Sequence, residues 1–505
     1  MAVPTSLSAL LDALPNSENK LGVLGDIKLI VNSMNPNNVR ESVRNVSFNV
    51  IFECLDTTDS KQIKACCDVL DKLLSASDAV SVVNTFHREL LLGLNHPSDT
   101  VQRLTLSQLL RGAQASVQQV LQHVDVITVM VNILSLENLD IVQKSAQILT
   151  ILATTPDGLE VLFHSPVIDQ FNHVLQQGDI VAYRVFEWVV DVCSLGHEAM
   201  NCCTAAGLLQ RLFNDLHKND VLIQLNCVDM LSKMAISLHG LQYLERQGVV
   251  HTLEGMMEGV DSDPMMHFLL PGLLKFFGRV GHRHPRKVCE RFPRFLSTLL
   301  TLVEDDSDAS LQNIAVETVG FIGHTVEGKH ALTKHTPQIN QVCKKIGQVL
   351  SSDAVSLRRI RFLVALSNLL HLDVSEQTTE LLSTTESWFY QLSSDPLSVF
   401  MKLAKQPFVE IRKVNLELLD ELANQPWAQK LMNNYAGFKE FLLDRSTEKT
   451  KEGKEAKYKV VRTLVNAPTT LDVFGRVYMM KLREYHNEGP FYVTAETAVD
   501  YEEAS

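Results

Sequence analysis

The sequence predicts an all-α fold in which a long row of helical repeats stacks into a solenoid. One stretch, Gly207 to Gly248, is a complete repeat of 41 residues, and aspartates recur along the chain at nearly the same interval. The composition agrees, because 45% of the 505 residues are hydrophobic but only 7% are aromatic. A solenoid reaches this length without a larger core, since each repeat buries its apolar face only against its neighbours.

The stretch from Gly207 to Gly248 contains three helical segments. Apolar residues from Leu208 to Leu216 recur at helical spacing, and a second periodic run follows Asp220. Gly240 interrupts that run, and the pattern restarts at Gly248. A period near 40 residues with two or three helices is typical of armadillo and HEAT arrays, so we expect about ten such repeats and no sheet.

Eight aspartates mark the repeats. An aspartate at the start of a helix accepts hydrogen bonds from backbone N–H groups and suits the positive end of the helix dipole. We therefore expect these residues to open helices. They are separated by 40, 41, 39, 41, 43, 45 and 45 residues: Asp59, Asp99, Asp140, Asp179, Asp220, Asp263, Asp308 and Asp353.

The pattern divides the chain into five parts. Gly158, Gly240 and Gly328 are expected to mark turns between a long and a short helix. Segments outside the repeat register predict caps at both ends, and a charged run predicts a solvated loop or helix end. The parts are an N-terminal helical cap (1–50), armadillo-like repeats (51–445), a charged loop (446–457), a C-terminal helical cap (458–486) and an acidic mobile tail (487–505).

Charge and cysteine content narrow the classes of partner and compartment. The net charge is −13, from 46 basic and 59 acidic residues, which disfavours nucleic acid and anionic membranes and favours a basic protein surface. The nine cysteines show no CxxC spacing and are expected to be reduced, buried thiols. No secretory signal or long apolar stretch is present, so we expect the protein in the cytoplasm, with the nucleus as a second compartment. We also expect it to be a monomer by itself.

No catalytic motif is present. The chain lacks a phosphate-binding glycine loop, a dinucleotide fingerprint, a nucleophile elbow and an HExxH sequence, so we expect no enzymatic activity and no cofactor. His282 and His284 lie within a basic run from Arg279 to Arg294, but an HxH pair without a further partner is a poor ligand set and predicts no metal site. The basic run forms either a patch for an acidic partner segment or a polar turn between repeats.

The candidate partner-binding surface is centred on Trp188. In the helix predicted after Asp179, valines form one face, and Trp188 stands on another among charged residues. Tryptophan and arginine are enriched at interface hot spots, although a tryptophan wedged between repeats is an equal alternative. The predicted stripe comprises Arg184, Glu187, Trp188 and Asp191, and continues onto Asn226, Asp229 and Lys233 of the next repeat.

Several short strings resemble the 26S proteasome non-ATPase regulatory subunit 5 family over about residues 90–493. They are Leu104-Thr-Leu-Ser-Gln, Leu270-Pro-Gly with Lys275-Phe-Phe-Gly, Cys289-Glu-Arg-Phe-Pro, Val326-Glu-Gly-Lys, Thr385-Glu-Ser-Trp-Phe, Asn424-Gln-Pro-Trp-Ala-Gln-Lys-Leu-Met and Glu488-Gly-Pro-Phe-Tyr-Val. The resemblance implies a chaperone for assembly of the base of the proteasome regulatory particle. Such a chaperone binds the C-terminal domain of an AAA ATPase ring subunit, together with other base subunits, and leaves before the particle is complete.

Two other functions fit an armadillo array. A nuclear-import adaptor would carry an asparagine one helical turn after its tryptophan, but Val192 follows Trp188 at that distance, and no repeat has the pair. A general protein–protein scaffold in signalling or trafficking remains as the alternative to the chaperone.

Overall fold

The computed structural model describes residues 7–45, 47–259 and 267–493, and within these ranges the regular elements are helices without a strand. The predicted all-α solenoid is confirmed. The chain divides into two compact units, Met1–Asn219 and Asp220–Ser505. In the first unit, a long helix is followed along the sequence by two shorter ones, and this order then repeats.

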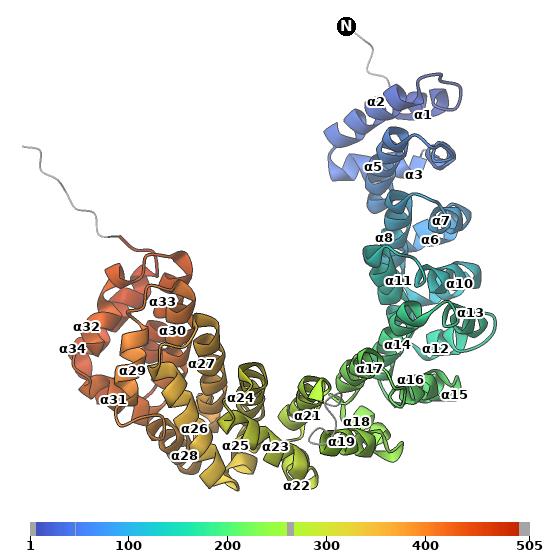
Figure 1. The fold of residues 1–505 in the computed structure, drawn as a ribbon. Helices are drawn as coiled ribbons and strands as arrows, with labels where there is room; N and C mark the ends of the chain where they lie inside the picture. Colours follow the sequence, from blue (N-terminus) through green and yellow to red (C-terminus); the bar gives the residue numbers. More distant parts are fainter. Residues whose placement is uncertain (1–6, 46, 260–266, 494–505) are drawn as a thin grey trace, which may run out of the picture. The chain divides into compact units, whose positions relative to one another are not determined.

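The long helices stack on one another in each unit (Figure 1). Gly320 and Ala365 show how close this packing is, because a Cβ at Gly320 would lie 2.6 Å from the carbonyl oxygen of Ala365 on the next long helix. The first unit has α2 (Lys20–Ser33), α5 (Ser60–Ala76), α8 (Asp99–Ala115), α11 (Leu139–Leu152) and α14 (Asp179–Cys193). The second has α17 (Val221–Met234), α21 (Leu270–Arg283), α24 (Ala309–Gly323), α27 (Ser356–Leu370), α30 (Val409–Ala423) and α33 (Lys451–Asn466).

The remaining helices cover the other side of each row, and most of them are shorter than the stacked helices. In the first unit these are α1 (Leu7–Ala13), α3 (Pro36–Asn45), α4 (Asn49–Glu53), α6 (Ala79–Thr85), α7 (His87–Leu94), α9 (Val117–Leu121), α10 (Val124–Ile133), α12 (Pro156–Leu162), α13 (Val167–Val174), α15 (His197–Ala205) and α16 (Leu208–Asp215). In the second they are α18 (Leu238–Arg246), α19 (Val249–Gly259), α22 (Pro285–Arg291), α23 (Pro293–Glu304), α25 (Val326–Thr333), α26 (Thr336–Ser351), α28 (Thr379–Tyr390), α29 (Pro396–Leu403), α31 (Pro426–Asn434), α32 (Phe438–Leu443) and α34 (Thr470–Glu488), with short 3-10 turns η1 (Val374–Glu376) and η2 (Arg445–Thr447). The second unit keeps the order of one long and two shorter helices from α17 to α23 and from α27 to α32, whereas α26 and α34 are longer than the helices that begin their repeats.

The aspartate ladder is confirmed as a marker of long helices but only partly as a set of caps. The side chains of Asp59, Asp220 and Asp308 accept hydrogen bonds from backbone N–H groups of the first turn, as N-caps do. Asp99, Asp140 and Asp179 instead lie inside the first turn, where they face the positive end of the dipole. Asp353 precedes α27 without capping it, since Val355 occupies that position, and Asp263 lies outside the described residues.

Three glycines lie inside short helices rather than in the turns before them. Gly158, Gly240 and Gly328 are each the third residue of α12, α18 and α25, and each N–H donates to a serine or threonine cap at 3.1 Å. A Cβ at any of them would clash with a carbonyl oxygen near the end of the preceding long helix. Glycine is therefore required by close backbone approach rather than by a left-handed turn. Gly207 and Gly248, the ends of the repeat, do have a left-handed backbone.

The predicted charged loop at 446–457 is wrong from Lys451 onward, where the alternative expectation, a helix end, is confirmed. Helix α33 begins at Lys451, and the hydroxyl of Thr450 caps it by accepting from the N–H of Gly453. Lys457 is buried, and its ammonium donates to the carbonyl of Asp444 at 2.5 Å and to the hydroxyl of Thr447 at 2.6 Å. Burial lowers the pKa of Lys457 to about 8. The charged sequence was misleading because these polar partners allow a lysine to be buried.

The two predicted ends also differ from the structure. Helix α2 packs against α5 as later long helices pack against each other, so the repeat pattern already begins at Lys20, inside the predicted cap 1–50. At the other end, the guanidinium of Arg445 donates to Glu488 at 2.8 Å and to the carbonyl of Gly489 at 2.7 Å. The start of the predicted mobile tail 487–505 is therefore held in place, and residues 494–505 lie outside the described ranges.

The cysteines are all free thiols, as expected, and only Cys202 is not fully buried. Burial raises the pKa of the Cys66 and Cys67 thiols to about 12, so both stay protonated at neutral pH. Among the described residues, no helix combines the length and the apolar character needed to cross a bilayer.

Candidate functional site

Trp188 lies in the core of the first unit and does not stand on a partner-binding surface. Its side chain is 1% exposed, and its ring stacks on Phe171 at 4.4 Å and on Phe163 at 6.0 Å between ring centroids. Phe163 caps the end of α12 and Phe171 lies in α13, so both rings come from the short helices that precede α14. The predicted hot spot is therefore corrected to a core residue wedged between helices.

Arg184 ties neighbouring repeats together instead of projecting freely. Its guanidinium donates to the carbonyl of Leu134 at 3.1 Å and also to the carbonyl of Leu136. These carbonyls follow the C-terminal end of α10, where backbone acceptors lack helical partners and a cation is favoured. Arg111 makes the same kind of contact two repeats earlier, with the carbonyls of Leu74, Ser75 and Ser77. The function of Arg184 is structural.

The remaining residues of the predicted stripe are accessible. Glu187 and Asp191 are exposed on α14, on the same face as Ile180, which is 73% exposed at the start of the helix. The spacing of 7 and 11 residues from Ile180 places all three along one side of an α-helix. We call these three residues the α14 stripe.

The second group of the prediction lies on α17, in the second unit. Asn226 and Asp229 are exposed, and Lys233 is half-buried. Asp229 accepts from the guanidinium of Arg279 at 3.4 Å, so this part of the surface joins α17 to α21. Because the two groups belong to different units, the continuation of the stripe from Asp191 to Asn226 remains a prediction.

Four of the six basic residues in the run from Arg279 to Arg294 lie near acidic side chains. Lys287 and Arg291 both approach Glu245, at 2.7 and 3.7 Å, and Arg286 lies 3.6 Å from Glu327. The two histidines of the run do not form a pair. His282 stacks on Phe321 at 3.9 Å, while burial lowers the pKa of His284. A polar connection between repeats is favoured over an open basic patch.

A different group of metal-ligating side chains comes together in the first unit. His87, His123 and Asp125 each place a ligand atom within 4.8 Å of the others. Sequence reasoning missed this group because it searched for ligands within one helix. The available signal was the interval between repeats, since His87 opens α7 and His123 immediately precedes α10 of the next repeat.

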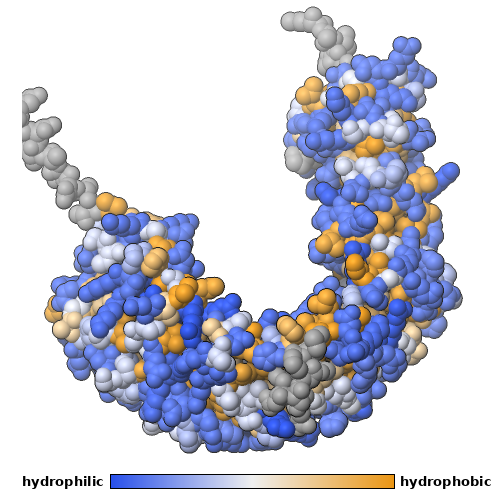
Figure 2. All heavy atoms as spheres, in the orientation of Figure 1, coloured by the Kyte–Doolittle hydropathy of each residue, from blue (hydrophilic) through white to orange (hydrophobic). Residues whose placement is uncertain are grey.

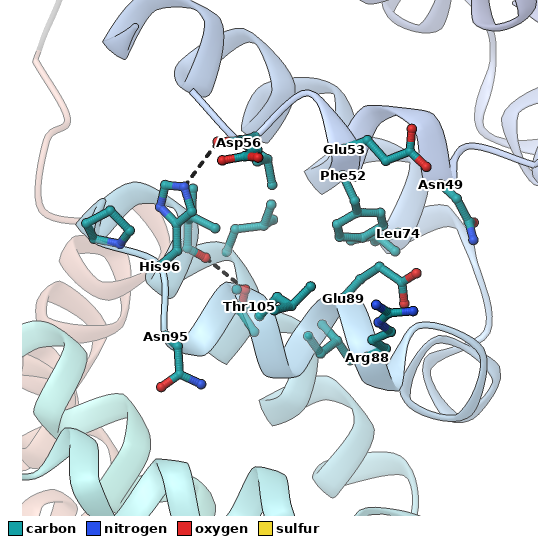
Figure 3. A pocket seen from close by; sticks show the side chains of 17 residues that line it. Asn49, Phe52, Glu53, Asp56, Leu74, Arg88, Glu89, Asn95, His96 and Thr105 are labelled. Atoms are coloured by element: carbon teal, nitrogen blue, oxygen red, sulfur yellow. Dashed lines mark hydrogen bonds between the residues drawn. The ribbon is translucent and has the colours of Figure 1, made fainter. Parts of the chain in front are cut away.

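A recess of about 630 Å³ lies between α4, α5, α7 and α8 (Figure 3). Phe52 and Leu74 form part of its apolar wall, and Glu53, Asp56 and Glu89 bring carboxylates to it. The imidazole of His96 lies 3.1 Å from the carbonyl of Leu55, and the hydroxyl of Thr105 donates to the carbonyl of Val101 at 2.9 Å. Arg88 also lines the recess, which therefore combines an apolar wall with three carboxylates and one guanidinium.

Comparison with known proteins finds similarity to one protein family along nearly the whole chain. A family model described as "Proteasome non-ATPase 26S subunit" matches residues 5–504. The chain is 37% identical over 488 residues to the Bos taurus protein named 26S proteasome non-ATPase regulatory subunit 5, with 96% of each chain covered. The Homo sapiens protein of the same name is 36% identical over 497 residues, covering 97% of this chain and 98% of that protein.

Solved structures agree on the fold alone. Importin beta superposes with a TM-score of 0.64 at 12% sequence identity, covering 95% of this chain and 59% of that chain. Identity at this level indicates a shared architecture and no shared function. The family match and the two mammalian relatives extend over nearly the full length, and the chain therefore belongs to the family of 26S proteasome non-ATPase regulatory subunit 5.

Proposed function

We propose that this protein is a chaperone for assembly of the base of the 26S proteasome regulatory particle. In this proposal it binds the C-terminal domain of an AAA ATPase ring subunit, in an intermediate with other base subunits, and leaves before the particle is complete. The observation that carries the proposal is the similarity to relatives named 26S proteasome non-ATPase regulatory subunit 5 over nearly the whole chain.

The architecture suits a binding protein. Each row of long helices offers a continuous surface that can cover a small domain. Such a protein acts by blocking access to the domain that it binds, and it needs no catalytic residues for this. On the face shown in Figure 2, both units are mostly hydrophilic, with several apolar patches between the hydrophilic side chains. We propose that the protein is not an enzyme, needs no cofactor, is a monomer by itself, and acts in the cytoplasm, with the nucleus as a second compartment.

Charge supports a partner with a basic surface. Residues 1–219 contain 14 basic and 23 acidic residues, a net charge of 14 − 23 = −9 out of −13 for the chain. Acidic surfaces accelerate association with basic partners and suppress encounters with acidic ones. The first unit is therefore the better candidate for the initial encounter with a basic domain.

The α14 stripe is our candidate contact in that unit. Ile180 supplies an exposed apolar side chain, and Glu187 and Asp191 supply carboxylates along the same helix face. The preceding long helix, α11, also begins with an exposed apolar residue, Leu139, which is 58% exposed. Apolar anchors beside a polar rim are a common composition for a protein interface.

Affinity capture from cell extract tests the proposal. The tagged chain should retain AAA ATPase ring subunits in complexes that lack the proteolytic core particle. Capture of signalling or trafficking proteins without any ATPase subunit would instead favour the general scaffold, and would contradict the chaperone assignment.

A further inference from the structure

Three side chains capable of binding a metal converge at the junction of two consecutive repeats in the first unit. His87 is the first residue of α7, His123 directly precedes α10, and Asp125 lies in the first turn of α10. The Nε2 atom of His87 is 2.9 Å from Oδ2 of Asp125, and the imidazole rings of His87 and His123 stack with centroids 4.4 Å apart. The three ligand atoms lie within 4.8 Å of one another.

We propose that His87, His123 and Asp125 bind a divalent transition-metal cation of the zinc class, which clips the two repeats together. Two imidazole nitrogens and one carboxylate oxygen form a ligand set that such cations accept at about 2.0–2.2 Å. Ligands at these distances around a tetrahedral ion are separated by less than the 4.8 Å that spans the present group, so small side-chain rotations would close the site.

The surroundings already orient one ligand. Nε2 of His123 lies 3.4 Å from the amide oxygen of Asn84, and the amide nitrogen of Asn84 donates to Gln119 at 2.8 Å. A carbonyl-type acceptor on one ring nitrogen fixes the tautomer and leaves the other nitrogen for a metal. Asn84 therefore holds the ring of His123, and its own side chain is held in turn by Gln119 of α9.

The site is open on one side. The side chains of His87 and Asp125 are 35% and 46% exposed, so a fourth ligand, water or a group from a partner, can reach the ion. Three protein ligands with one open position resemble a reactive zinc site more than a closed structural one. We nevertheless assign the group a linking role, because its ligands come from both sides of the contact between α7 and α10.

Titration of the chelator-treated full chain with Zn²⁺ tests the site. Calorimetry should show one tight site per chain, and the melting temperature should rise with Zn²⁺, because an ion that binds only the folded state stabilises it. Replacement by Co²⁺ should give visible d–d bands without the thiolate charge-transfer band that cysteine ligands would produce.

His87→Asn, His123→Asn and Asp125→Asn should each weaken Zn²⁺ binding by at least about tenfold, the loss typical of disturbing a metal site. His217→Asn, at an exposed histidine outside the group, should bind as wild type does. Circular dichroism first confirms that each variant is folded. Because His87 and Asp125 form a pair even without metal, the variants are compared by the rise in melting temperature that Zn²⁺ adds to each metal-free protein.

Two results would overturn the inference. One is wild-type protein that shows no tight site, and the other is cluster variants that bind as tightly as His217→Asn, which would indicate an adventitious ion only. Neither result bears on the proposed chaperone function, because the inference rests on the group of ligands alone.

Discussion

The indole ring of Trp188 lies on the ring of Phe171, with centroids 4.4 Å and planes 14° apart. This contact fastens α14 to α13, and it turns the residue most suggestive of an interface into part of the core. The indole Nε1 has no hydrogen-bond partner among the described residues, so the side chain acts through packing alone.

Trp188→Ala should lower the free energy of unfolding by about 3–5 kcal/mol, the cost of emptying a large buried site. Trp188→Phe should cost less than Trp188→Ala, because a ring still packs against Phe171 and no indole hydrogen bond is lost. Chemical denaturation measures both. A Trp188→Ala variant as stable as wild type would contradict the assignment to the core.

Asp220→Ala should cost about 1 kcal/mol, since it removes the cap that accepts from the N–H groups of Leu222 and Ile223. Asp353 offers a matched control, because it belongs to the same ladder of aspartates but caps no helix. Asp353→Ala should leave the free energy of unfolding within about 0.5 kcal/mol of wild type. Equal losses for the two variants would show that the capping geometry does not matter.

Arg412 of α30 and Glu448, which precedes α33, form a buried ion pair. The guanidinium donates to both carboxylate oxygens at 3.1–3.2 Å, and the side chains are 12% and 1% exposed. Glu448→Gln should destabilise by about 3 kcal/mol or more, because it leaves a buried guanidinium without its counter-charge. Glu417→Gln, which breaks an exposed pair with Lys413 at 3.8 Å, should cost at most about 0.5 kcal/mol. Similar losses in urea unfolding for the two variants would contradict this difference.

Acid should destabilise the second unit through protonation of His324. Burial, followed by the charges of His371 and Lys329, lowers the pKa of His324 to about 4, against 6.5 for the free side chain. Between these values the unfolded chain binds more protons than the folded one, so His324 favours unfolding as the pH falls from 6.5 towards 4. His324→Asn should therefore make unfolding less sensitive to acid in this window.

His371, the neighbouring histidine, has the opposite effect on the pH dependence of stability. A hydrogen bond to Glu421 raises the pKa of His371, so its contribution to stability is present at low pH and is lost as the pH rises through that raised value. His371→Asn should remove this contribution, so the gain in stability between the raised pKa and about 6.5 on acidification should be lost. Urea midpoints measured from above the raised pKa of His371 down to pH 4 compare the variants, and parallel pH profiles for both would contradict the opposite signs assigned to the two histidines.

The sequence was sufficient to predict the repeats and many helix starts, because both depend on local signals. Asp220 precedes a periodic apolar run, and it caps α17 as expected. The same reasoning failed at Trp188, because the width of the buried face of α14 depends on the helices that cover it from the preceding repeat. It failed at Lys457 for a related reason, since the carbonyl and hydroxyl that bind its ammonium precede α33 in the chain.

Juxtapositions across repeats were also beyond the sequence alone. His87 and His123 are 36 residues apart, and nothing local distinguishes them from other histidines. Only the stacking of α7 on α10 brings their rings together. A search for ligand types at equivalent positions of successive repeats would have found them, once the boundaries of the helices were known.

Direct binding to isolated ATPase domains tests the central claim most sharply. The purified full chain is titrated with the C-terminal domain of each AAA ATPase ring subunit, and complex formation is followed by calorimetry and size-exclusion chromatography. We predict a stoichiometric complex with one of these domains, weakened by Glu187→Lys and Asp191→Lys but unaffected by Trp188→Phe. If wild-type protein that is folded binds none of the ATPase domains, the chaperone assignment is contradicted.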